Sequence, residues 1–101
     1  MNDNVTNSML YILIALDVGQ KHGYGIVKWV NEKSGKFTLK SGSVYGVLSR
    51  MIDKDLIVKS DKVQRRQYYC ITSRGRDVLR QEIARVKDLI KVYASSIVLQ
   101  S

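Results

Sequence analysis

The longest apolar run in the chain lies close to its N-terminal end. After a polar start, residues 9–16 are MLYILIAL, which predicts a buried helix. Thr6 or Asn7 is expected to cap the free amides of this helix, and Gly19 to end it. The run is far shorter than the roughly 20 residues that cross a bilayer, so no membrane anchor is expected.

Two further helices are expected before residue 55. In residues 22–35, HGYGIVKWVNEKSG, Tyr24 begins a helical row of apolar side chains, and Gly35 is a residue type that often forms a left-handed helix end. In residues 41–54, apolar side chains again recur at helical spacing, and Ser41 or Ser43 is expected to cap that helix.

The pattern then changes to that of strands. Residues 56–60, LIVKS, and 66–72, RQYYCIT, are short and rich in β-branched and aromatic side chains. The charged segment between them, DKVQR, predicts a hairpin with a basic tip.

From Thr72, a plausible cap, the chain is expected to form one helix to near Leu99. A helix of about 25 residues would be nearly 38 Å long, more than a small domain is wide, so part of its apolar face is expected to need a second copy of the chain. That face has heptad spacing and consists of Leu79, Ile83, Val86, Ile90, Tyr93 and Ile97.

This order of elements predicts a mainly α fold with a small β-hairpin, namely a winged helix-turn-helix followed by a long dimerisation helix. We expect residues 1–71 to form the DNA-binding part and residues 72–101 the dimerisation helix, in one compact unit. The third helix would enter the DNA major groove by its N-terminal end.

Charge supports a polyanionic partner. The chain has 17 Lys and Arg against 9 Asp and Glu, for a net charge of +8. A small domain this basic has nucleic acid or an anionic membrane surface as its default partner, although charge also aids solubility. Double-stranded DNA is the partner that agrees with the predicted fold.

The chemistry of enzymes and metal sites has little support in the sequence. One cysteine, Cys70, and one histidine, His22, cannot supply the four ligands of a zinc site, and no cofactor is expected. The single cysteine suits a reducing, cytoplasmic location. His22 has no nucleophile or second carboxylate in a recognisable relation to it, and its place at a helix start suggests a cap instead.

Small polar residues open the third helix and are the candidates for DNA contact. Free amides at a helix start attract phosphate, hydroxyls bind phosphate or base edges, and glycine permits close approach. The candidates are Ser41, Gly42, Ser43 and Tyr45, with Arg50 two turns beyond Ser43. The alternatives are that the serines only cap the helix, that Tyr45 packs on the core, and that Arg50 is a solvated surface residue.

The predicted hairpin carries more cations than folding requires. Lys62, Arg65 and Arg66 are expected to contact phosphate or the minor groove beside the third helix.

Three segments together resemble the PadR family of bacterial transcriptional regulators. They are LIALDVGQKHGYGIVKWV (13–30), SGSVYGVLSRMIDKDLI (41–57) and RRQYYCITSRG (65–75), and the likeness extends from about Met9 to Leu79. Only one helix follows the hairpin, as in the short branch of the family. Asp55 stands where the family often has a glycine that turns the chain into the wing.

The resemblance implies a homodimer that binds a palindromic operator, usually as a repressor. It places Tyr24, Ser43 and Tyr45 at the DNA face and Lys62, Arg65 and Arg66 on the wing. Some members bind flat effectors against a tryptophan of the last helix. Here the only tryptophan is Trp29, in the second predicted helix, so no effector is predicted.

Two other functions stay open from the sequence. A basic winged helix could coat repeated sites in plasmid or phage segregation and genome maintenance, or it could have lost DNA binding and serve as a protein-interaction module. The strongly basic hairpin disfavours the second of these.

Overall fold

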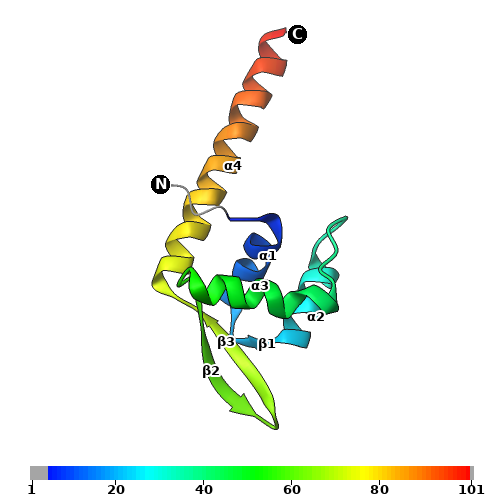
Figure 1. Ribbon diagram of the computed structural model, residues 1–101. Coiled ribbons are helices and arrows are strands. Elements are labelled where there is room, and N and C mark those ends of the chain that lie inside the picture. The colour runs from blue at the N-terminus through cyan, green and yellow to red at the C-terminus, as the bar shows by residue number, and fades with distance from the viewer. Residues whose placement is uncertain (1–4, 101) are drawn as a thin grey trace.

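The computed structural model describes residues 5–100, with side chains to residue 97, and it forms a small helical body from which one long helix projects (Figure 1). The three-stranded sheet lies at the opposite end of the body from the projecting helix. In chain order the elements are α1 (Asn7–Val18), β1 (Lys21–His22), α2 (Gly23–Lys33), α3 (Ser41–Asp53), β2 (Ile57–Val63), β3 (Arg66–Ile71) and α4 (Ser73–Gln100). In this part of the chain, no helix is both long and apolar enough to span a bilayer.

The first two helices begin where capping side chains can satisfy their free amides. Thr6 Oγ1 accepts from Met9 N at 3.2 Å and Gly19 follows the end of α1, as predicted. The prediction of a left-handed end at Gly35 is wrong. Helix α2 ends at Lys33, and the chain leaves through Ser34 with an extended backbone, so no left-handed residue is required.

Helix α3 has the predicted position but not the predicted cap. Lys40 is its N-cap residue and makes no capping bond with its side chain. The Ser43 hydroxyl instead donates backwards to the Lys40 carbonyl oxygen at 3.2 Å. The prediction that Ser41 or Ser43 caps α3 is therefore wrong, because the helix already begins at Ser41, one residue too early for a cap at Ser41 and three too early for a cap at Ser43.

The sheet has three strands, one more than predicted. Its order is β1-β3-β2, and β1 pairs antiparallel with β3 through Lys21 opposite Tyr69 and His22 opposite Tyr68. Two residues are too few to show an alternating pattern in the sequence, so β1 was not predicted. Its consequence is that the start of α2 is tied directly to the hairpin.

The hairpin formed by β2 and β3, hereafter the wing, is longer and tighter than expected. The predicted five-residue loop is wrong, since β2 continues to Val63 and only Gln64 and Arg65 connect the strands. Both have positive φ, 50° and 67°, as a two-residue turn of type I′ requires. The turn lacks the usual Asn-Gly pair, and a register shift between Lys59 and Lys62 accompanies it.

A group of polar contacts joins α3, the wing and α4. Asp55 has φ 60°, a conformation that aspartate tolerates, at the place where the resemblance suggested glycine. The Thr72 hydroxyl donates to the Asp55 carbonyl at 2.7 Å and accepts from Gly75 N at 2.9 Å, so Thr72 caps α4 as predicted. A Cβ on Gly75 would collide with the Leu56 carbonyl oxygen, so only glycine allows this approach.

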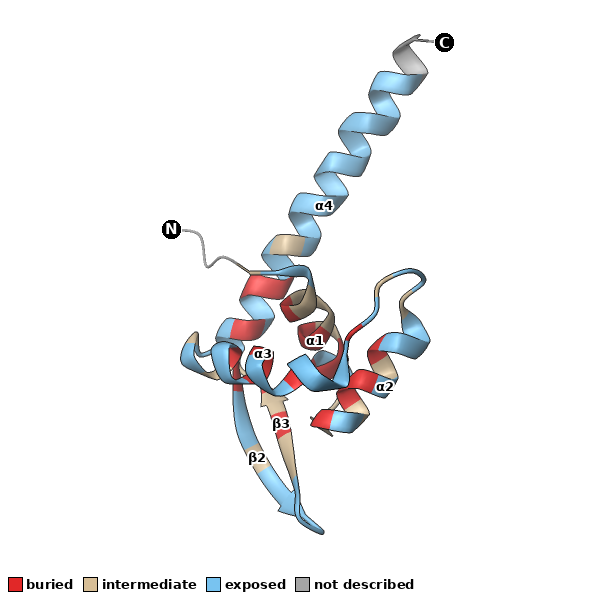
Figure 2. Cartoon of the chain, turned by 45° about the vertical axis from the view of Figure 1, so that its right-hand side comes forward, coloured by how far each residue is buried: buried red, intermediate tan, exposed pale blue. Residues whose placement is uncertain are grey.

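The core is formed around α1, and α4 contributes only its first two turns (Figure 2). Leu79 is 7% exposed and packs within its own chain, which differs from its predicted place at a dimer contact. The reason is that α1 lies against this part of α4. Every described residue from Ile83 to Ile97 is exposed. The part of α4 that was predicted to need a second copy of the chain therefore begins at Ile83.

Candidate nucleic-acid interface

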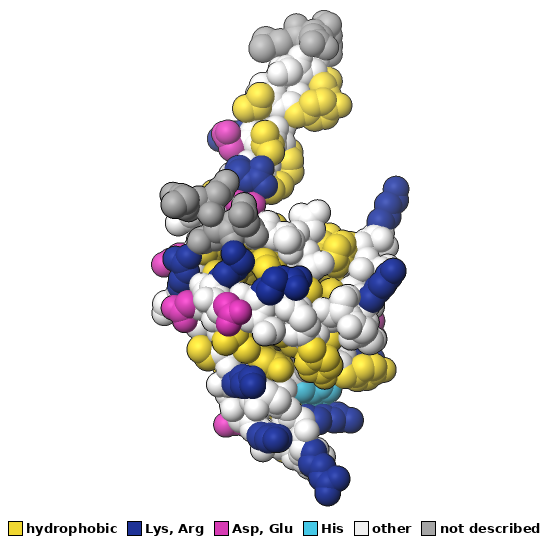
Figure 3. All heavy atoms as spheres, in the orientation of Figure 1, with side chains coloured by type: hydrophobic (Ala, Val, Ile, Leu, Met, Phe, Trp, Pro, Cys, Tyr) yellow, Lys and Arg dark blue, Asp and Glu magenta, His cyan; other side chains and the backbone are white. Residues whose placement is uncertain are grey.

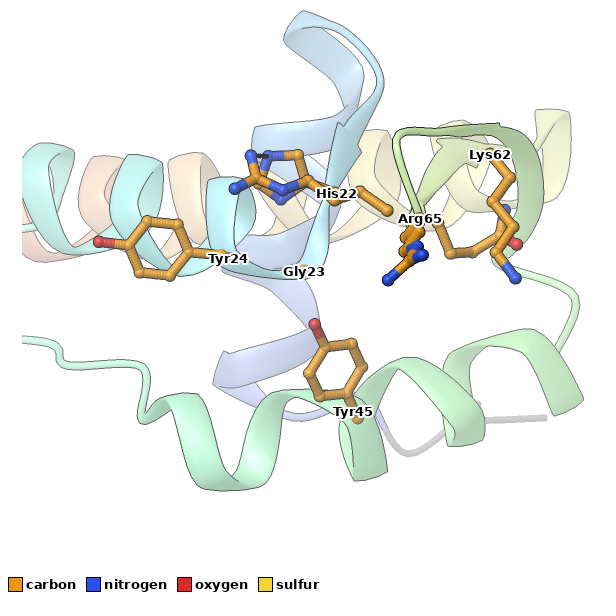
Figure 4. A pocket seen from close by; sticks show the side chains of 8 residues that line it. His22, Gly23, Tyr24, Tyr45, Lys62 and Arg65 are labelled. Atoms are coloured by element: carbon orange, nitrogen blue, oxygen red, sulfur yellow. Dashed lines mark hydrogen bonds between the residues drawn. The ribbon is translucent and has the colours of Figure 1, made fainter.

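A cavity of about 320 Å³ opens where the start of α2, helix α3 and the wing meet. Figure 4 shows Tyr45 directed from α3 toward Gly23, and Lys62 and Arg65 directed from the wing into the same space. The cavity is therefore bounded by three elements that lie far apart in the sequence. Its lining residues are His22, Gly23 and Tyr24 before and in α2, Tyr45 on α3, and Lys62, Arg65, Arg66 and Gln67 on the wing.

His22 links the wing to α2. Its Nδ1 accepts from Gly25 N at 3.1 Å, which caps the helix, and its Nε2 lies 3.3 Å from Arg66 Nη1. The ring also meets Tyr68 edge-on, with centroids 5.2 Å apart. Partial burial, followed by the positive charge of Arg66, lowers the pKa of His22 below its usual value, so the ring is neutral near pH 7.

Tyr45 lies directly against Gly23. A Cβ built on Gly23 would come within 2.6 Å of the Tyr45 hydroxyl oxygen, so the ring occupies the space that any side chain at this position would need. Tyr45 is nevertheless 59% exposed. It therefore presents one face to solvent in front of α3 while the tip of the ring touches α2, which does not support the alternative that Tyr45 is a core residue.

The wing presents cations without counterions. Within the described residues, no carboxylate forms an ion pair with Lys62, Arg65 or Arg66. Figure 3 shows Lys and Arg side chains over the wing, with the histidine beside them. Gln67 holds the strands in place, because its Nε2 donates to the carbonyls of Ser60 and Asp61, each at 3.2 Å.

The other predicted contact residues lie on the exposed face of α3, outside the cavity lining. Ser41, Gly42 and Ser43 form its exposed first turn, and nothing lies within 4 Å of a Cβ added at Gly42. Arg50 is also exposed, and its guanidinium lies back along the helix beside Gly46. The structure thus brings Tyr24, Tyr45, Lys62, Arg65 and Arg66 together around one cavity and leaves the other four on the adjoining surface.

Three cavity residues were missed in the sequence. Gly23 and Gln67 carry no signal that separates them from ordinary turn and strand residues, and His22 was interpreted only as a cap. The segment HGYG did contain a signal for His22. A histidine that caps α2 must place its ring at the start of that helix, and so beside any element that packs there.

A second concave surface lies between α1 and α4. This groove has a volume of about 210 Å³ and is almost entirely apolar. It lies beside the part of α4 whose described residues, from Ile83 on, are exposed. Its lining residues are Asn7, Leu10, Tyr11 and Ile14 of α1 and Glu82, Ile83 and Val86 of α4.

Two other residues discussed from the sequence, Trp29 and Cys70, lie outside the cavity lining. Trp29 is half-buried against the core, with Lys21 Nζ 5.3 Å from its ring centroid. Cys70 is partly exposed, and its thiol donates to Gln20 Oε1 at 3.7 Å. Among the residues that the structure describes, no cluster of three or more His, Cys, Asp or Glu side chains could hold a metal ion.

Known structures share this fold. A PadR family transcription regulator from Clostridium difficile R20291 is 32% identical, with 88% of this chain and 96% of that chain covered and a TM-score of 0.73. Bacillus subtilis PadR, solved in complex with operator DNA, is 23% identical over 77% of this chain and 47% of its own, with a TM-score of 0.71. The second likeness concerns the fold alone.

The sequence comparisons agree with the structural ones. The chain is 34% identical over 76 residues to an uncharacterized 37.1 kDa protein in transposon TN4556 of Streptomyces fradiae, and it spans 22% of the length of that protein. The family model of the transcriptional regulator PadR-like family matches residues 12–81. This chain, with its winged helix-turn-helix and long C-terminal helix, therefore belongs to the PadR-like family of transcriptional regulators.

Proposed function

We propose that this protein is a sequence-specific binder of double-stranded DNA that acts as a dimeric transcriptional repressor. The observation that carries the proposal is the cavity in which the start of α2, helix α3 and the wing meet, with its unpaired cations Lys62, Arg65 and Arg66. Unpaired cations on one surface supply the sequence-independent attraction to phosphate that holds a protein on a duplex.

Helix α3 would supply the base contacts. Its first turn is exposed and small, with Ser41, Gly42 and Ser43 projecting from the body, so the helix can approach base edges in the major groove by this end. Tyr45 lies two residues beyond Ser43 and lines the cavity. The wing would then lie across the neighbouring backbone, with Lys62 and Arg65 within reach of phosphates.

The dimer would form through α4 and the groove beside it. Exposed apolar side chains of α4 extend well beyond the heptad face, because Leu89 and Val92 are 56% and 57% exposed next to Ile90 and Tyr93. An apolar arc this wide exceeds what one partner helix covers. We infer that the partner covers it with its α4 and with its own groove between α1 and α4, and that the contact is reciprocal, as a two-fold axis requires.

A two-fold dimer presents two copies of α3 to the same side of the duplex. The expected site is therefore an inverted repeat whose half-sites are about one helical turn apart, roughly 34 Å. Bound over a promoter, such a dimer would repress transcription by preventing polymerase from binding there.

Selection from a random duplex library tests the proposal. The purified protein is incubated with the library near physiological salt, and bound sequences are recovered over several rounds. Enrichment of a palindrome, with a scrambled duplex of the same composition competing poorly, is the expected result. Equal competition by the scrambled duplex would exclude sequence-specific binding, and a lack of salt-sensitive binding to any duplex would exclude a role on DNA.

A further inference from the structure

The two ring nitrogens of His22 cannot both accept a hydrogen bond. A neutral imidazole has one N–H and one lone pair. Nδ1 accepts from Gly25 N at 3.1 Å, and this amide is at the start of α2, where no carbonyl of the helix can serve it. The cap thus assigns the lone pair to Nδ1 and the proton to Nε2.

The group nearest to the Nε2–H is one that cannot accept it. Arg66 Nη1 lies 3.3 Å from Nε2, and a guanidinium has only donors (Figure 4, dashed). The remaining charged groups that face this place are Lys62 and Arg65, both cationic, while Tyr68 presents its ring to the imidazole. Two N–H donors therefore lie 3.3 Å apart at the cavity lining, and within the described residues neither donates to an acceptor.

Resting on the proposed function, we propose that His22 and Arg66 together hold one phosphate of the DNA backbone, with His22 Nε2–H and the Arg66 guanidinium donating to its oxygens. An anionic oxygen can accept from both donors, and it replaces the repulsion between them with attraction. The site lies at the start of α2, whose partial positive charge adds to the attraction. His22 would then contact the first turn of α2 through Nδ1 and the phosphate through Nε2, while Arg66 of the wing contacts the same phosphate. DNA binding would therefore fix the wing against α2.

The lone histidine allows a direct test by NMR. Protein without a histidine tag has a single imidazole, so its ring signals need no assignment among several. In the free protein, the nitrogen shifts should show the tautomer with the proton on Nε2. Addition of a duplex of about 20 base pairs at low salt should shift these signals and raise the pKa of His22, because a nearby phosphate favours the charged ring.

Affinity measurements with variants separate this role from capping. His22→Asn keeps a capping oxygen and should preserve the melting temperature, but it should weaken binding about threefold to tenfold through the lost donor. Measured at about pH 8, where the ring is neutral, this variant should leave the salt dependence unchanged. Arg66→Gln should weaken binding about tenfold or more and lower the slope of log affinity against log salt by about one.

The double variant provides the decisive comparison. If both groups hold the same phosphate, His22→Asn should cost much less in an Arg66→Gln background than alone, because the phosphate is no longer fixed in place. Duplex binding with unchanged His22 signals, or with independent losses in the two variants, would overturn the inference alone. Failure of the wild-type protein to bind any duplex would instead overturn the proposed function.

Discussion

The arginines of α4 and those of the wing differ in whether they have a counterion. On α4, Arg76 pairs with Asp17 at 3.2 Å and Arg85 with Glu82 at 3.0 Å, and the bond to Glu82 raises the pKa of Arg85. On the wing, Arg65 and Arg66 have no carboxylate partner among the described residues. The difference concerns these arginines and not the net charge of each region, because α4 also carries Lys87 and Lys91.

The exposed uncharged side chains follow the same division. Beyond Glu82 the α4 surface is rich in Val, Leu and Ile, whereas α3 exposes serine and glycine in its first turn. A second copy of the chain carries the same charge and would be repelled by a bare cationic surface, so the ion pairs of Arg76, Arg80 and Arg85 suit an apolar contact between copies. The unpaired wing suits a polyanion. The difference indicates one surface for the partner protomer and another for DNA.

The largest effect is expected from a charge on the apolar face of α4. Ile90→Glu would place two carboxylates in the proposed dimer contact, so the dimer dissociation constant should rise at least about a hundredfold. Ala84→Glu is the matched control, because it adds the same residue to the exposed opposite side of α4. Analytical ultracentrifugation measures both, and dissociation of the two variants to the same extent would place the contact elsewhere.

Next in size is the effect of the wing arginines on DNA. Replacing Arg65 and Arg66 by alanine should weaken binding to every duplex by roughly a hundredfold and lower the salt slope by about two. Replacing the paired Arg80 and Arg85 by alanine removes the same formal charge and should change affinity by less than about threefold. Fluorescence anisotropy over a range of salt concentrations compares the pairs, and equal losses would show that only total charge matters.

A smaller effect is expected where α2 and α3 touch. Gly23→Ala should turn the Tyr45 ring away, since the added Cβ needs the same space and the ring is half exposed. Affinity should fall about threefold to tenfold while the melting temperature stays equal or rises, because alanine favours helix. Gly35→Ala, where nothing lies within 4 Å, is the control. A fall in melting temperature for Gly23→Ala would show that the Tyr45 contact is needed for folding.

The smallest effect concerns pH. The pKa of His22 lies below its unfolded value, so the unfolded chain takes up the proton first as the pH falls. The contribution of His22 to the free energy of unfolding is thus complete above the unfolded pKa of about 6.5 and is lost as the pH falls through the folded pKa. Urea unfolding from about pH 8 to 5 should show a steeper decline for the wild-type protein than for His22→Asn. Parallel curves would contradict the lowered pKa.

Much of the fold was predictable because its signals are local. The apolar run of α1, the cap at Thr72 and the heptad spacing of α4 each lie within one segment, so periodicity and capping chemistry suffice to find them. The cap of α3, the end of α2 and the two-residue wing turn were mispredicted because each depends on backbone angles that several residue types can adopt.

The candidate site divides in the same way. The cationic wing and the small polar residues at the start of α3 could be predicted from the sequence, because charge and side-chain size belong to individual residues. Three other features became visible only in the folded chain: His22 lies beside Arg66, Tyr45 covers Gly23, and the exposed face of α4 begins at Ile83. These depend on distances between segments far apart in the sequence, such as the 44 residues between His22 and Arg66, and they arise when strand pairing and core packing are satisfied together.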